Sequence, residues 1–173
     1  MSSIITDSEI AKILNRPKQL PRGWRSRLMS MRKRKDDHQR KSEIEWKEGN
    51  ESVVIKCRQN TLCLSDFSVI LVYVDKEGNE YRLMRCNGKH PSRHTNLWEK
   101  QQGHKDHTFD VCFHVHRATQ RYQEADLEID GFAEPTDAYS DYNGALEHLI
   151  GICGFIDPEP PAPATPDMFG GAS

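Results

Sequence analysis

The stretch SVILVYVDKEGNEYRLMRC, residues 68–86, decides the fold. Its first seven residues are mostly β-branched or apolar, which is typical of a central strand buried on both faces. Residues 75–79 (DKEGN) have the composition of a hairpin loop, and residues 80–86 (EYRLMRC) form the returning strand. The stretch therefore predicts an antiparallel pair at the centre of a meander.

Further strands are predicted on both sides of this pair. Residues 43–49 (EIEWKEG) alternate apolar and charged side chains, and residues 52–58 (SVVIKCR) follow the turn at Gly49-Asn50. Residues 107–116 (HTFDVCFHVH) alternate again, so one strand is expected there, with its phenylalanines and valines facing the core. His114 and His116 would then lie side by side on the opposite, solvent-facing side.

Helices are predicted near both ends of the chain. Thr6 or Asp7 can cap a short N-terminal helix that stops before Pro17, and a second short helix is expected over 118–125. Ser140 or Asp141 can cap the last helix, which glycines terminate.

The expected fold class is α+β, an antiparallel meander sheet of about five strands with the C-terminal helices packed on one face. The expected division is an N-terminal helix (1–15), a basic arm (16–42), the α+β domain (43–156) and a disordered tail rich in Pro, Ala and Gly (157–173).

The overall composition indicates one cytoplasmic domain with extended ends. The chain has 173 residues, of which 36% are hydrophobic and 29% are charged. Neither a membrane-spanning apolar run nor a signal peptide is visible in the sequence, so we expect no membrane contact. Its five cysteines include no C-x-x-C pair, which predicts reduced and mostly buried thiols.

The net charge of −2 hides a cationic segment. Between residues 16 and 41 there are eleven Lys or Arg against two Asp, which suits a phosphate backbone, and Trp24 could stack on a base. The alternative is a solvated leader, or one covered by the acidic remainder of the chain. The candidate nucleic-acid contacts in this segment and beyond it are Arg22, Trp24, Arg25, Arg27, Arg32, Lys33, Arg34, Lys35, Lys89, Arg93 and Arg117.

Six of the eight histidines lie between residues 81 and 122, mixed with arginines. Imidazole transfers protons near neutral pH and is a common metal ligand, so the cluster predicts acid–base chemistry or metal binding. A metal-independent ribonuclease needs a base, an acid and cations for the phosphate. The candidate catalytic residues are His94, His114, His116, Arg82 and Arg85.

Two metal hypotheses stay open beside this one. No cofactor is required by the ribonuclease hypothesis, but zinc could bind through His104, His107, His114 and His116, although no closed-site spacing is present. The acidic connector 124–141 could hold a divalent cation, or could simply be a solvated face.

Three segments carry a resemblance. YRLMRCNGKHPSRHTN (81–96), FHVHRATQRYQ (113–123) and FAEPTDAYSDYNGALEHLIGICGF (132–155) resemble an uncharacterised family of small bacterial and phage-borne proteins. The order of a Tyr-Arg strand, an Asn, a histidine loop and a closing H-x-H is also similar, more loosely, to TumE-like toxins of toxin–antitoxin pairs. The resemblance draws attention to Arg82, Arg85, Asn87, His90, His94, Asn96, His114, His116 and Thr119.

Two functional hypotheses follow. The first is a nucleic-acid-directed effector of a toxin–antitoxin or phage-conflict system, with RNA as the favoured target, an endoribonuclease activity, and an antitoxin or host protein as partner. The second is a non-enzymatic inhibitor that engages a nucleoprotein through the basic arm.

Overall fold

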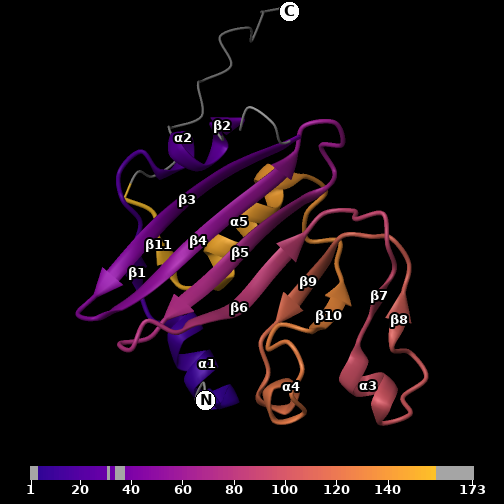
Figure 1. The fold of residues 1–173 in the computed structure, drawn as a ribbon. Coiled ribbons are helices and arrows are strands. Elements are labelled where there is room, and N and C mark those ends of the chain that lie inside the picture. The colour runs from indigo at the N-terminus through magenta and orange to yellow at the C-terminus, as the bar shows by residue number, and fades with distance from the viewer. Residues whose placement is uncertain (1–3, 31, 34–37, 159–173) are drawn as a thin grey trace, which may run out of the picture.

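The computed structural model describes residues 4–30, 32–33 and 38–158. Its main element is a seven-stranded antiparallel sheet with the order β10-β9-β6-β5-β4-β3-β2 (Figure 1). Its strands are β2 (Arg32–Lys33), β3 (Gln39–Glu48), β4 (Glu51–Asn60), β5 (Phe67–Val74), β6 (Glu80–Asn87), β9 (His114–Arg117) and β10 (Phe132–Pro135). The α+β prediction is confirmed. The sequence underestimated the number of strands because β2 and β10, at the two edges, are too short to show a clear alternation.

The predicted central hairpin is the pair β5–β6. Ile55, Leu71 and Met84 lie opposite one another on adjacent strands and are buried, which continues the core across the sheet. The register shifts between Leu71 and Val72, so a bulge interrupts the ladder. The meander β3–β4–β5–β6 therefore forms as the alternation predicts.

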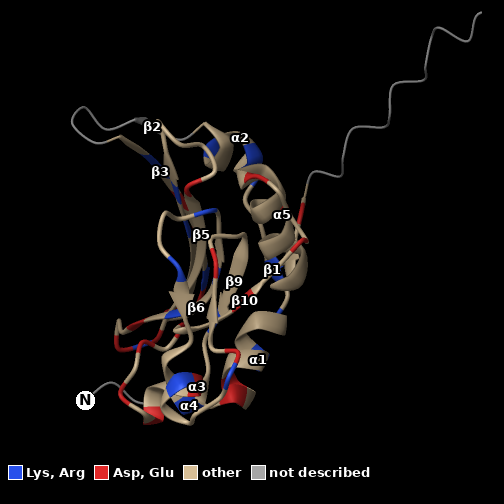
Figure 2. Ribbon diagram, turned by 90° about the vertical axis from the view of Figure 1, so that its right-hand side faces the viewer, with Lys and Arg blue, Asp and Glu red and all other residues tan. Residues whose placement is uncertain are grey.

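Helices cover one face of this sheet. Figure 2 shows α1 (Asp7–Asn15), α2 (Trp24–Met29) and α5 (Tyr142–Ile152) along the same side. Leu146 and Leu149 of α5 are fully buried, and the helix packs on β5 and β6. Thr6 forms a capping box with Glu9 at the start of α1, which confirms the predicted cap. Cys153, just after α5, contacts Met84 of β6, so Arg85 and Asn87, which alternate with Met84 along that strand, face away from the helices.

The expectation of one strand over 107–116 is wrong. β8 (Thr108–Phe109) pairs with β7 (His94–Thr95), the chain then leaves the sheet with Val111 44% exposed, and β9 begins only at His114. α3 (Leu97–Gln101) connects β7 to β8 and lies with them beside β9 and β10 (Figure 1). This β7–β8 lobe (residues 94–109) packs on β9, where His94 contacts His114 and His116. His114 and His116 are therefore only 6% and 3% exposed, and their predicted solvent exposure is also wrong.

The described part of the basic arm is folded into the domain. β1 (Lys18–Gln19) pairs in parallel with β11 (Phe155–Ile156), Trp24 of α2 is fully buried, and β3 already begins at Gln39, before the expected domain boundary. The short helix expected near residue 120 is α4 (Gln120–Glu124), which lies at the lower end of the molecule and not on the sheet face with α5 (Figure 1). Almost all of the expected tail lies outside the described residues.

Two further observations concern composition. All five cysteines are free, and Cys57, Cys86 and Cys153 are buried. Among the described residues, every helix is too short or too polar to cross a lipid bilayer.

Candidate metal centre

The register of β6 and β9 pairs two histidines with two polar residues. Arg85 lies opposite His116 and Asn87 lies opposite His114, so the four side chains share one face of the sheet. Arg85 Nη2 is 3.1 Å from His116 Nδ1, and Asn87 Nδ2 donates to His114 Nε2 over 3.2 Å. The two-residue spacing of H-x-H predicted that His114 and His116 lie side by side, and their ring centroids are 5.0 Å apart.

The β7–β8 lobe adds the third histidine. The ring centroid of His94 lies 5.7 Å from that of His114 and 4.7 Å from that of His116. One ring nitrogen from each of these three residues lies within 4.8 Å of the other two, and no other such group of possible metal ligands occurs among the described residues. His94, His114 and His116 could therefore hold a metal ion.

Hydrogen bonds assign the protons on the three rings. His114 Nδ1 is 2.8 Å from Cys112 O, and His116 Nδ1 is 2.8 Å from Asp130 O. A carbonyl oxygen only accepts, so each Nδ1 carries the proton and each Nε2 keeps its lone pair. Arg85 Nη2 also lies near His116 Nδ1, but a guanidinium nitrogen cannot accept a hydrogen bond. The proton on Nδ1 is therefore donated to Asp130 O.

His94 has the opposite tautomer. Its Nε2 lies 3.0 Å from Asn96 Oδ1 and 3.2 Å from Gly131 O, two acceptors, so Nε2 carries the proton and Nδ1 keeps the lone pair. Asn96 is itself held by two hydrogen bonds to the backbone of Ala133 in β10. Each of the three histidines thus donates one N–H to an oxygen, which is the arrangement that orients histidines as metal ligands.

Burial keeps the three rings neutral. It lowers the pKa of His94, lowers that of His114 to about 4, and lowers that of His116 to about 2 with the added repulsion of the Arg85 guanidinium. At neutral pH all three are therefore unprotonated. They can bind a metal or accept a proton, but the free protein has no protonated imidazole here to act as a general acid.

A buried ion pair lies beside the histidines. The carboxylate of Asp130, 1% exposed, is 3.2 Å from Arg85 Nη2 and 3.4 Å from Arg82 Nε. Arg82 also pairs with Glu128. Burial lowers the pKa of Arg85 and Asp130 opposes the shift, so the guanidinium stays charged. Arg85 Nε is buried without a hydrogen-bond partner among the described residues, which leaves a donor for an anionic ligand.

A cavity of about 320 Å³ lies at the candidate metal centre. Its walls include the three histidines, Arg85 and Asn87, and its rim includes Arg93. This volume is at the small end of the range for ligand pockets, about 300–1,000 Å³. The cavity admits a group of the size of a phosphate with part of its substituents.

The other histidines of the cluster lie outside the metal group. His90 lies at the cavity wall, 5.9 Å from the His114 ring between centroids, and its Nδ1 donates to Asp66 Oδ1 over 2.7 Å. His104 is exposed, and His107 Nδ1 donates to the His104 carbonyl. Of the four zinc ligands expected from the sequence, His114 and His116 belong to the group that could hold a metal ion; His104 and His107 do not, and His94 does.

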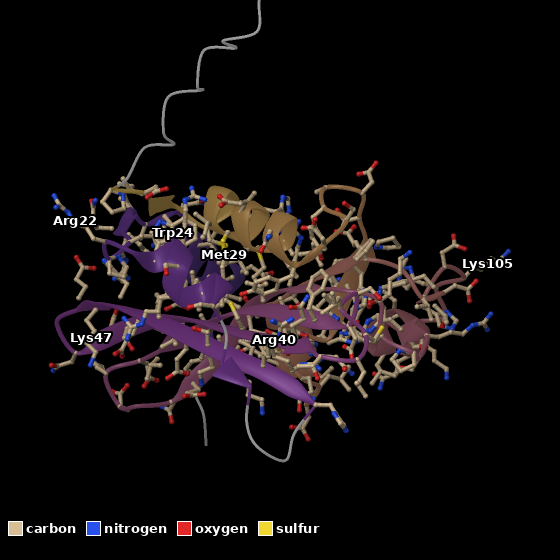
Figure 3. All side chains as sticks on the ribbon, turned by 90° about the horizontal axis from the view of Figure 1, so that it is seen from above. Arg22, Trp24, Met29, Arg40, Lys47 and Lys105 are labelled. Carbon is tan, nitrogen blue, oxygen red and sulfur yellow. The ribbon has the colours of Figure 1, made fainter. Side chains whose placement is uncertain are left out.

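The predicted nucleic-acid contacts are scattered. Trp24, the first residue of α2, cannot stack on a base, because its side chain is fully buried and its Nε1 donates to Asp157 (Figure 3). Arg25 pairs with Glu147 and Asp157. Arg22 and Arg27 are exposed, and Figure 3 shows Arg22 at the opposite end of the molecule from Lys105.

Of the remaining predicted contacts whose side chains are described, only Arg93 lines the cavity. Arg93, exposed and paired with Asp110, lies at the rim. Lys89 Nζ lies over the Phe113 ring at 5.1 Å from its centroid, and Arg117 faces Glu134. Arg32 and Lys33 form β2, whose side chains are not described, and Arg34 and Lys35 lie outside the described residues.

Sequence reasoning missed Asp130. It was one of seven carboxylates in the acidic connector, and only the return of the chain into β10 distinguishes it. Asn87 and Asn96 were singled out by the resemblance alone, because an isolated asparagine forms no recognisable sequence pattern.

The chain matches no protein-family model, no curated protein and no solved structure.

Proposed function

We propose that the protein is a metal-dependent phosphodiesterase that cleaves RNA, with His94, His114 and His116 as metal ligands. The observation that carries this proposal is the set of three neutral imidazoles, each with one ring nitrogen within 4.8 Å of a ring nitrogen of the other two, beside Arg85. Three histidines with an open position are a common donor set for catalytic zinc.

A metal centre fits these residues better than the metal-independent ribonuclease expected from the sequence. That mechanism needs one imidazole that holds a proton near neutral pH, and burial lowers the pKa of all three candidates. A bound divalent cation supplies instead a Lewis acid for the phosphoryl oxygen and lowers the pKa of water that it binds. His114 and His116 then act as ligands and not as an acid–base pair.

The arginines favour a phosphate-bearing substrate. Arg85 lines the cavity, and its guanidinium is held by the buried carboxylate of Asp130, 3.2 Å from Nη2. Arg93 at the rim can reach a neighbouring phosphate. RNA remains the favoured polymer because of the resemblance to TumE-like toxins, which also supports a role as effector in a toxin–antitoxin or phage-conflict system.

Metal analysis and an RNA cleavage assay test this function together. Untagged protein should contain about one equivalent of zinc or another transition metal. Cleavage of RNA should stop in a chelator and return when the metal is restored. His94→Ala and the pair His114→Ala, His116→Ala should each lose activity by ~100-fold or more.

The control is the pair His104→Ala, His107→Ala, which removes histidines of the same segment that lie outside the metal group. It should keep wild-type metal content and cleavage. Cleavage that survives chelation and the loss of His114 and His116 would overturn the proposal. RNA binding without cleavage under any metal would favour the non-enzymatic inhibitor.

A further inference from the structure

Asn87 occupies a distinctive position at the candidate metal centre. It is the last residue of β6, its side chain is 2% exposed, and it forms part of the cavity wall opposite His114. Its Nδ2 donates to His114 Nε2 over 3.2 Å. Its Oδ1 is buried and has no hydrogen-bond partner among the described residues.

An unpaired buried amide oxygen requires a physical explanation. Such an acceptor destabilises the fold when no donor or ion satisfies it. The present hydrogen bond also hinders metal binding by His114. The amide N–H of Asn87 occupies the Nε2 lone pair that His114 would give to an ion. One half-turn of the amide about its last side-chain bond would aim Oδ1 at a cation and free the lone pair of His114, and it would move the NH2 group to the present position of Oδ1; amide orientation is assigned from such networks.

The distances agree with this half-turn. It places Oδ1 where Nδ2 is, 3.2 Å from His114 Nε2. Two lone pairs at that distance repel each other unless a cation lies between them. Two ligands of one zinc ion, each about 2.0–2.2 Å from it in tetrahedral geometry, are separated by roughly 3.4 Å.

The backbone of Asn87 is held in place for such a role. The hydroxyl of Tyr139 lies 3.1 Å from Asn87 O and 2.8 Å from His114 O and donates to these carbonyls, so one side chain ties the two residues together. The next residue is Gly88, where a Cβ atom would come within 1.9 Å of Ser65 O. The close approach of the β5 side of the sheet therefore fixes the end of β6.

We infer that Asn87 is the fourth protein ligand of the metal centre, binding the ion through its amide oxygen. This inference rests on the proposed metal-dependent function and adds a ligand to it. Three imidazoles and one amide are all neutral, so the bound ion keeps its full positive charge. A water or phosphodiester oxygen would then bind as a fifth ligand, which zinc centres accommodate, and the charges of the ion and Arg85 would favour an anionic ligand.

Zinc affinity of metal-free protein tests the inference without an activity assay. Asn87→Ala should weaken zinc binding by on the order of 100-fold. Asn87→Asp should bind zinc at least as tightly as wild type, because a carboxylate is also an oxygen ligand and adds a negative charge. If Asn87 only donates its N–H to His114, it competes with the metal for Nε2, and Asn87→Ala should bind zinc at least as tightly as wild type.

Cobalt substitution and a charge control complete the experiment. The visible absorption of the Co²⁺ protein should change in Asn87→Ala and stay close to wild type in Asn87→Asp. Asn143→Asp introduces the same charge at an exposed position of α5 and should leave zinc affinity unchanged. Equal affinities of wild type, Asn87→Ala and Asn87→Asp overturn the inference alone, whereas a wild-type protein that binds no zinc overturns the proposed metal-dependent function as well.

Discussion

Lowering the pH from 7 to 5 should destabilise the metal-free protein through His114 and His116. Their pKa values in the folded state, about 4 and about 2, lie below the ordinary value of 6.5. Between these values the unfolded chain binds more protons than the folded one. The free energy of unfolding therefore rises with pH in this window, and stability is lost as the pH falls below 6.5.

The size of the effect follows from the same pKa values. At pH 5 each unfolded imidazole is almost fully protonated and each folded one is almost fully neutral, so each ring contributes about 2 kcal/mol and the two together about 4 kcal/mol. This is a large share of a typical domain stability of roughly 5–15 kcal/mol. His90 and His94, whose pKa values burial also lowers, act in the same direction.

Urea unfolding in chelator at pH 5, 6, 7 and 8 measures this effect. The variant His114→Gln, His116→Gln should show a pH dependence of the unfolding free energy that is smaller than wild type by about 4 kcal/mol over this range. His104→Gln changes an exposed histidine and should follow the wild type. Parallel curves for the wild type and the double variant would refute the assignment of buried neutral rings.

Three substitutions test the folded basic segment and the end of β6. Trp24→Ala should lower the free energy of unfolding by about 3–5 kcal/mol in urea, since it empties a fully buried site and removes the hydrogen bond to Asp157; a loss below 1 kcal/mol would contradict the burial. Lys18→Met should cost roughly 3 kcal/mol or more in thermal unfolding, because the buried amine donates to three backbone carbonyls that would lose their donor. Gly88→Ala should unfold the protein or greatly reduce its soluble yield, because the added Cβ would lie 1.9 Å from the carbonyl oxygen of Ser65. The control Gly151→Ala should be tolerated, because its Cβ would meet nothing within 4 Å.

Local patterns predicted most of the framework. The strands β3 to β6, the caps of α1 and α5 and the side-by-side placement of His114 and His116 all follow from spacing within a few residues. The involvement of His94 was also predicted, although its partners on β9 were expected to face solvent. Long-range contacts were not predictable in this way, so Trp24 was assigned to an exposed arm while it lies in the core.

By itself, the sequence determined the meander, the helix starts and the concentration of imidazoles near arginines, because these depend on residue type and on neighbours in the chain. The tertiary structure decided the chemistry. The β7–β8 lobe packs on β9 and buries the rings, and the carbonyl groups of Asp130 and Gly131 accept hydrogen bonds from His116 and His94. Burial and these acceptors, which come from segments far apart in the chain, make neutral imidazoles that could hold a metal ion out of residues expected to face solvent as acid–base groups.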